Sequence, residues 1–110
     1  MKHKVRITVL RREYFQDLAD QYLADPNTGK CPVFQDGQEV IVDNEGFFRM
    51  LHGGFCAEAW DGISRYVYAA LQGGSIMRGW ANDEEVQIAC CNDGTRPGIF
   101  NPERLDAEED

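Results

Sequence analysis

The chain lacks long apolar runs, and nothing in its 110 residues approaches the length of a membrane-spanning helix. Its opening stretch, MKHKVRITVLRREYF, lacks the apolar core of a secretory signal peptide. These absences predict a cytoplasmic protein without a membrane role. In a reducing compartment the four cysteines are expected to be free thiols rather than a disulfide framework.

Positive charge is also scarce. The chain carries 11 Lys and Arg against 19 Asp and Glu, which gives a formal net charge of −8 at pH 7. A field of this sign repels phosphate backbones and argues against nucleic-acid binding. The basic residues cluster on the first predicted strand, where we expect them to solvate a sheet edge and balance nearby acids. They are Lys2, His3, Lys4, Arg6, Arg11 and Arg12.

The spaced motifs of zinc and nucleotide sites are missing. The cysteines stand at positions 31, 56, 90 and 91, and the chain contains no CxxC knuckle and no HExxH helix. Its two Gly-Gly pairs lack the strand–loop–helix context of a phosphate-binding loop. A zinc or iron site built from residues distant in sequence stays open, because two of the cysteines are expected in loops. The candidate ligands are Cys31, Cys56, His52 and one of Cys90 and Cys91.

The residues that are present indicate one α+β domain over residues 1–105, followed by a disordered acidic tail over residues 106–110. Apolar periodicity predicts a small mixed or antiparallel sheet of about four strands, with a C-terminal hairpin and two helices packed on it. Strands are predicted at residues 3–11, Glu39–Val42, residues 75–80 and the hairpin, and helices at about residues 14–24 and at Ala57–Gln72. The segment from Phe47 to Phe55 is expected to be an irregular loop.

Two glycines of the second helix carry structural predictions. Gly62 costs about 1 kcal/mol relative to alanine inside a helix, and a close helix–strand contact is the usual reason to accept it. We therefore expect a strand to pass close to the helix at Gly62. Gly73 supplies the left-handed residue that ends the helix.

Asp93-Gly94 between two short apolar runs is a strong hairpin signal. A two-residue turn there places Cys91 opposite Arg96. The guanidinium would favour the thiolate of Cys91, which makes this pair the candidate catalytic nucleophile and its activator. The alternative is that both side chains are structural. The core face is expected to hold Val86, Ile88, Cys90, Pro97 and Ile99, and the partly covered face Gln87, Ala89, Cys91, Arg96 and Phe100.

A second candidate nucleophile is Cys56 with His52, which lie close in sequence in a Gly-rich loop before a helix. The helix N-terminus would favour the thiolate of Cys56. The alternative is that His52 is an exposed loop residue.

Aromatic residues around the second helix exceed what one buried stripe needs. Such a surplus suggests either an apolar pocket for a small-molecule ligand or a self-association surface. Self-association is the commoner outcome for a small cytosolic domain, so a homo-oligomer is expected. The residues are Phe47, Phe48, Phe55, Trp60, Tyr66, Tyr68 and Trp80.

Four segments carry a family resemblance. They are RITVLRREYFQDLADQYL, CPVFQDGQEVIV, GFCAEAWDGISRYVYAALQGG and IACCNDGTRPGIFNPERL. In combination they make the chain similar to a family of short, uncharacterised bacterial and archaeal proteins of about this length. The resemblance implies no activity, but all four cysteines lie inside these segments, which favours a role for the thiols. The chain departs from the family pattern at Ala57, where a proline is common, and in a longer FFRMLHGG stretch, which weakens a role for His52.

These observations favour a small cytosolic module that binds a ligand or assembles with itself, with Cys31, Cys56 and Cys91 as its functional thiols. The alternative is a thiol- or metal-dependent enzyme that uses Cys91 activated by Arg96. The two classes differ in thiol accessibility, because an enzyme needs a reactive thiol beside a cleft and a structural module buries all four.

Overall fold

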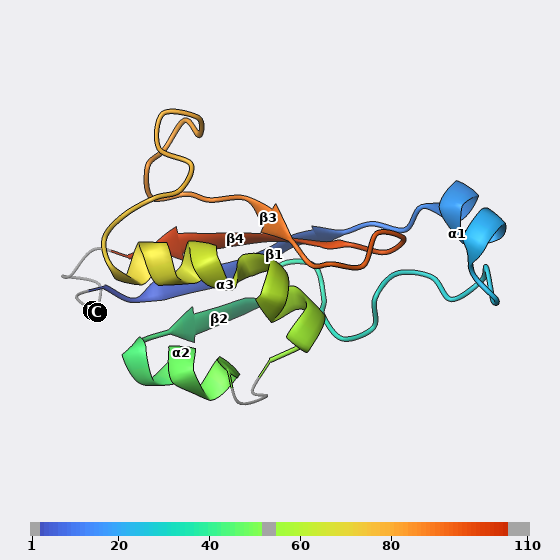
Figure 1. Ribbon diagram of the computed structural model, residues 1–110, viewed down its shortest axis with the longest axis horizontal. Helices are drawn as coiled ribbons and strands as arrows, with labels where there is room; N and C mark the ends of the chain where they lie inside the picture. Colours follow the sequence, from blue (N-terminus) through green and yellow to red (C-terminus); the bar gives the residue numbers. More distant parts are fainter. Residues whose placement is uncertain (1–2, 52–54, 106–110) are drawn as a thin grey trace.

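Four antiparallel strands form a single sheet in the order β2-β1-β4-β3 (Figure 1). The computed structural model describes residues 3–51 and 55–105, so the tail predicted at residues 106–110 lies outside the described residues. The strands are β1 (Val5–Arg12), β2 (Glu39–Val42), β3 (Ala89–Cys90) and β4 (Gly98–Arg104). With the helices described below, they confirm an α+β fold with a small antiparallel sheet and a C-terminal hairpin.

Strand β1 lies between β2 and β4, so the expectation that this basic strand forms a sheet edge is wrong. The reason is that β1 pairs on both sides, with β2 along Val5–Thr8 and with β4 from Val5 opposite Arg104 to Arg12 opposite Gly98. The predicted alternation is confirmed, because every second side chain from Val5 to Val9 is buried. The charges on the other face are balanced by acids, as for Arg6, whose Nη2 lies 2.9 Å from a carboxylate oxygen of β4.

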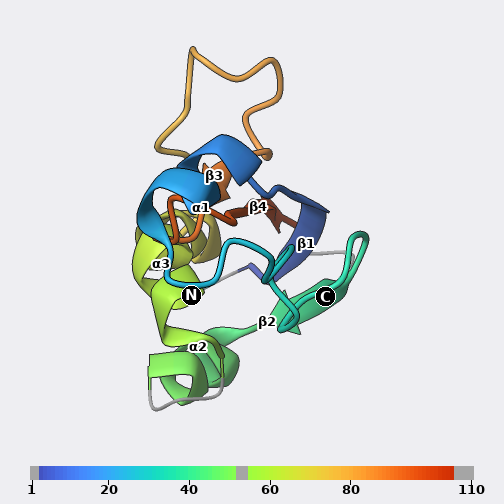
Figure 2. The same cartoon turned by 90° about the vertical axis from the view of Figure 1, so that its right-hand side faces the viewer.

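Helix α3 (Ala57–Leu71) packs its apolar stripe on the sheet, which confirms the helix predicted at Ala57–Gln72 (Figure 2). Its buried residues are Ala59, Trp60, Ile63, Val67, Ala70 and Leu71. They share one core with inward side chains of β1 and β4, which include Ile7 and Phe100. Among the described residues, no helix is both long enough and apolar enough to span a membrane.

Both glycine predictions for α3 are confirmed. A Cβ atom on Gly62 would lie 2.2 Å from the carbonyl oxygen of Cys90, so the strand passes closer to the helix than any side chain permits. Gly73 has a φ of +84° and follows the helix. The next N–H, of Gly74, donates to the carbonyl oxygen of Ala69 at 2.8 Å, which satisfies a carbonyl left free by the helix end.

Residues Asn44–Leu51 form helix α2, so the expectation of an irregular loop is wrong for this part of the segment. Asp43 starts the helix, because its Oδ1 accepts a hydrogen bond from the Gly46 N–H at 2.7 Å and satisfies a donor of the first turn. Phe47 then packs into the core, with its ring centroid 5.3 Å from that of Trp60. Helix α2 thereby covers the β2 side of α3 (Figure 1).

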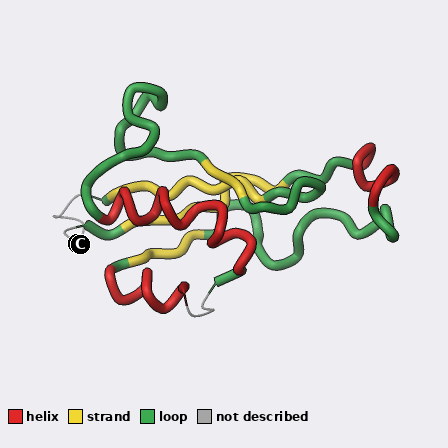
Figure 3. Tube along the Cα trace, in the orientation of Figure 1, coloured by secondary structure: helices red, strands yellow, loops and turns green. Residues whose placement is uncertain are grey.

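Helix α1 (Gln16–Tyr22) lies beyond the end of the sheet and confirms the centre of the helix predicted over residues 14–24 (Figures 1 and 3). Residues 72–88 form a loop, part of which projects from the molecule (Figures 1 and 2), so the strand predicted at residues 75–80 is wrong. Trp80 lies in this loop and is 82% exposed.

The connection between β3 and β4 is longer than the predicted two-residue turn at Asp93-Gly94. Cys90 pairs with Ile99 rather than with Pro97, a shift of two residues. The returning arm of the loop is held instead by the segment that follows β1, since Glu13 N–H donates to the Pro97 carbonyl oxygen at 2.9 Å. The prediction that Cys91 lies opposite Arg96 is therefore wrong.

Most residues of the hairpin lie on the face opposite to the one predicted, although Pro97 is buried as expected. Ile88 and Cys90 are exposed, whereas Gln87 and Phe100 are at most 1% exposed. Cys91 packs against the core. Burying the large ring of Phe100 removes more apolar surface from water than burying Ile88, which explains the choice of face.

Candidate functional site

A pocket of about 150 Å³ opens where the loop before β2, the start of α3 and the β3–β4 loop meet. Its lining includes Cys31, Val33, Phe34, Cys56, Cys91 and Gly98, together with the charged residues Glu58, Asp93 and Arg96. Three of the four cysteines therefore line one cavity, which we call the three-thiol pocket. All four cysteines are free, and the three in the pocket are partly buried and pack against the core.

Cys56 reaches the pocket from the N-cap position of α3. Its backbone is extended, with φ −61° and ψ 125°, and its carbonyl oxygen accepts the first intrahelical hydrogen bond, from the Trp60 N–H at 2.8 Å. Its side chain makes no capping hydrogen bond. The thiol is therefore held by the backbone geometry of the helix start and stays available to the pocket.

Cys91 reaches the pocket from the residue after β3. Its N–H donates to the Gly98 carbonyl oxygen at 3.2 Å, and the Gly98 N–H donates to Cys91 Sγ at 3.4 Å. This pair of hydrogen bonds holds the thiol on the inner face of the hairpin. The close approach of α3 at Gly62 keeps the same backbone in place, since a Cβ there would lie 3.3 Å from Cys91 Cα.

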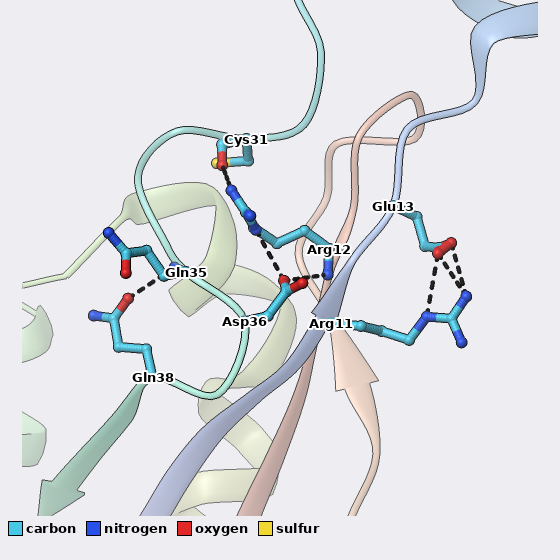
Figure 4. Close-up of polar contacts among 7 residues, drawn as sticks. All are labelled: Arg11, Arg12, Glu13, Cys31, Gln35, Asp36 and Gln38. Atoms are coloured by element: carbon cyan, nitrogen blue, oxygen red, sulfur yellow. Dashed lines mark hydrogen bonds and ion pairs between the residues drawn. The ribbon is translucent and has the colours of Figure 1, made fainter.

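Cys31 is fixed to the sheet through Arg12, the last residue of β1. Arg12 Nη1 donates to the Cys31 carbonyl oxygen at 2.9 Å, and Arg12 Nε donates to Asp36 Oδ1 at 2.9 Å (Figure 4). The hydrogen bond from Arg12 lowers the pKa of Asp36 from its ordinary value, so the pair stays charged at neutral pH. One guanidinium thus ties both ends of the segment that carries Cys31.

Arg96 reaches the pocket through the β3–β4 loop, because Asp93 folds that loop. Asp93 Oδ1 accepts hydrogen bonds from Thr95 N–H at 3.0 Å and Arg96 N–H at 3.2 Å, and Oδ2 accepts from Arg96 Nε at 3.1 Å. Burial raises the pKa of Asp93, but the hydrogen bonds from Thr95 and Arg96 lower it by more. The terminal amino groups of Arg96 have no hydrogen-bond partner among residues 3–51 and 55–105.

The structure divides the predicted site residues into two groups. Cys91 and Arg96 line the same pocket, although not as cross-strand neighbours, and Cys31 and Cys56 join them. Cys90 is exposed on the opposite face of the hairpin, and His52 lies outside the described residues. In the part of the chain that the structure describes, no three His, Cys, Asp or Glu side chains are grouped to hold a metal ion. A zinc or iron site that includes His52 stays a prediction.

Sequence reasoning missed Phe34, Glu58 and Asp93 as parts of the site. Phe34 is buried, and its ring centroid lies 5.2 Å from that of Phe55 and 5.1 Å from that of Phe100. An aromatic residue inside the polar stretch CPVFQDG was the available signal, because such a ring seldom stays in water.

Comparison of the chain with protein-family models, with curated proteins and with solved structures finds no match. The resemblance of its four segments to a family of short proteins stays a prediction. The geometry of the three-thiol pocket is what supports a function.

Proposed function

We propose that this chain is a binding module for a small, mainly apolar ligand held in the three-thiol pocket. The observation that supports the proposal is the convergence of Cys31, Cys56 and Cys91, from three segments distant in sequence, on one cavity. Each segment is fixed by its own hydrogen bonds, so the cavity is formed before a ligand arrives. Preformed apolar cavities with a few placed polar groups are the usual form of small-molecule sites.

The size and lining of the pocket set the ligand class. A cavity of about 150 Å³ is large enough for a benzene ring in a protein interior, so the ligand has a body of about one six-membered ring. Sulfur and carbon atoms of the cysteines, Val33 and Phe34 suit an apolar body. The terminal amino groups of Arg96 can donate hydrogen bonds to a single polar substituent.

The expected affinity follows from the same size. A ligand of about six heavy atoms gains at most about 9 kcal/mol, at a ceiling of about 1.5 kcal/mol per atom. We therefore expect a dissociation constant between about 1 μM and 1 mM. Free thiols persist in a reducing compartment, such as the cytoplasmic location that the sequence predicts.

Self-assembly is the second candidate function. It is favoured by Trp80, which is 82% exposed on the projecting loop over residues 72–88. Large exposed apolar side chains on a projecting segment are typical of protein contacts. The net charge of −8 likewise disfavours nucleic acid as a partner.

The test is a titration of the reduced protein with benzene, followed by amide chemical shifts in NMR. We expect saturable shifts at residues of the three-thiol pocket. Cys91→Met fills the pocket and should abolish the shifts, whereas Cys90→Met, one residue away on the exposed face, should leave them unchanged. Well-dispersed spectra of both variants show that the fold is kept. Equal binding by both variants, or shifts elsewhere on the molecule, would contradict the proposal.

A further inference from the structure

We infer that the three-thiol pocket reduces small hydroperoxides, with two of its three cysteines forming a disulfide across the cavity. This inference rests on the proposed function, because it assigns a substrate class to the same pocket. Hydrogen peroxide or a short alkyl hydroperoxide fits a cavity of about 150 Å³.

The first support is the number and placement of the thiols. A binding pocket needs no sulfur, yet Cys31, Cys56 and Cys91 all line this one, and each is partly rather than fully buried. Partial exposure admits a small oxidant, whereas fully buried cysteines are inert. A second thiol beside the first is what converts a single oxidation into a disulfide.

The second support is the set of donors around the thiols. The Gly98 N–H holds Cys91 Sγ at 3.4 Å, on the side of the hairpin that faces the cavity. Arg96 contributes to the same lining, and its terminal amino groups have no hydrogen-bond partner among the described residues. A guanidinium in this place can donate hydrogen bonds to an oxygen that acquires charge as it leaves.

The chemistry balances with the pocket thiols and the peroxide alone. The first sulfur attacks one peroxide oxygen, so an S–O bond forms while the O–O bond breaks, and the other oxygen leaves as an alcohol or water after taking the proton of that thiol. The second thiol attacks the resulting sulfenic acid, so an S–S bond forms, the S–O bond breaks, and water leaves with the second proton. The peroxide gains two electrons, and the two thiols lose them. A dithiol reductant such as dithiothreitol restores the pair by exchange.

Disulfide formation also closes the pocket. The two sulfur atoms must come to about 2.05 Å of each other, which leaves no room for a ring between them. The oxidised protein should therefore release a ligand that the reduced protein binds.

The test is to treat reduced protein with one equivalent of tert-butyl hydroperoxide, trap remaining thiols by alkylation, and measure intact mass and fragment spectra without reductant. Cys90 is the internal control, because it is the most exposed cysteine and lies outside the pocket. We expect the monomer to lose two hydrogens and two titratable thiols, with Cys90 still alkylated. C90S should behave like the wild type, and at least two of C31S, C56S and C91S should lose the reaction.

Several results would overturn the inference: a disulfide that includes Cys90, oxidation only between two molecules, or oxidation of Cys90 before any pocket thiol. Fragment spectra of the wild-type protein decide this without any variant, so a variant that folds poorly does not obscure the result. Benzene binding separates the two proposals. If the reduced protein binds benzene but forms no pocket disulfide, the proposed function stands and the redox step is refuted. If a pocket disulfide forms but benzene does not bind, the redox step stands and the proposed function is refuted.

Discussion

Gly62→Ala tests whether the contact between α3 and the hairpin positions Cys91. Alanine is worth about 1 kcal/mol more than glycine inside a helix, so an isolated helix would gain stability. Here the added Cβ would lie 2.2 Å from the Cys90 carbonyl oxygen and 3.2 Å from its carbonyl carbon. Both atoms belong to the backbone, so the helix and the strand must separate by about 1 Å to reach ordinary contact.

Overpacking of this kind costs typically about 1–3 kcal/mol, and more where backbone must move. The separation also strains the hydrogen bond from the Asn92 N–H to the Glu58 carbonyl oxygen, now 3.3 Å. After the gain in helix propensity, we expect Gly62→Ala to lower the free energy of unfolding by about 2 kcal/mol. The measurement is equilibrium unfolding in guanidinium chloride, monitored by circular dichroism. The variants are compared at the same dependence of the unfolding free energy on denaturant concentration.

Gly94→Ala is the matched control, because a Cβ at Gly94 meets no heavy atom within 4 Å. This variant should keep or gain stability by up to about 1 kcal/mol through the unfolded state. If Gly62→Ala were as stable as wild type, the hairpin would not lie against α3, and the placement of Cys91 in the three-thiol pocket would fall with it.

Three further variants test the loops around the core. Burial raises the pKa of Asp93, but hydrogen bonds from Thr95 and Arg96 lower it more, below the ordinary 3.8, so the carboxylate stabilises the fold above that value. This contribution is lost as the pH falls through the folded-state pKa. Between about pH 5 and pH 2, the urea midpoint of Asp93→Asn should therefore fall less steeply with pH than that of the wild type. An equally steep fall would contradict this prediction. Gln87 is 1% exposed, accepts from the Ile76 N–H at 3.1 Å and donates to the Tyr66 carbonyl oxygen at 2.9 Å. Gln87→Ala leaves the Ile76 N–H and the Tyr66 carbonyl oxygen unpaired, so it should lower the free energy of unfolding in urea by about 2 kcal/mol. An unshifted urea midpoint would refute this prediction. If the projecting loop drives the predicted self-association, Trp80→Ser should shift the sedimentation of the protein toward that of a monomer. The control is Tyr22→Ser, which changes a side chain on α1 that is 71% exposed and should not alter sedimentation.

The features predicted well from the sequence are those set by neighbours along the chain. The alternation in β1, the buried stripe of α3 and the stop at Gly73 each depend on a short window of residues. Gly62 belongs with them, because an unfavourable residue inside a strong helix pattern predicts a contact even when its partner is unknown.

The features that were predicted wrongly depend on side-chain hydrogen bonds and on which surfaces of the folded chain pack together. Asp93 caps the N–H groups of Thr95 and Arg96, and this opens a longer loop than the Asp-Gly turn suggests. Asp43 similarly starts α2, although Asp43 and Gly46 together resemble an ordinary turn. In each case a single carboxylate decided between two local structures.

The three thiols of the candidate site were predictable, but their assembly into one pocket was not. Cys31, Cys56 and Cys91 follow from the sequence as the thiols of interest, but their meeting depends on three segments that contact only in the folded chain. The faces of the hairpin were predicted wrongly for most residues, and Cys91 packs against the core on the same side as Phe100 of the neighbouring strand β4. No periodicity within the hairpin distinguishes its two faces, since both carry apolar residues.

The pairing of β1 with β4 makes completion of the sheet a late event in folding. Val5 lies opposite Arg104, so the chain must be synthesised at least as far as Arg104 before this ladder can close along its full length. Contacts between residues so far apart in sequence slow folding, because the chain loses the entropy of loop closure before strand pairing contributes any stabilising free energy. A nascent chain still on the ribosome therefore holds its cysteines outside any pocket, and the chaperones and reductants that meet it there encounter unprotected thiols.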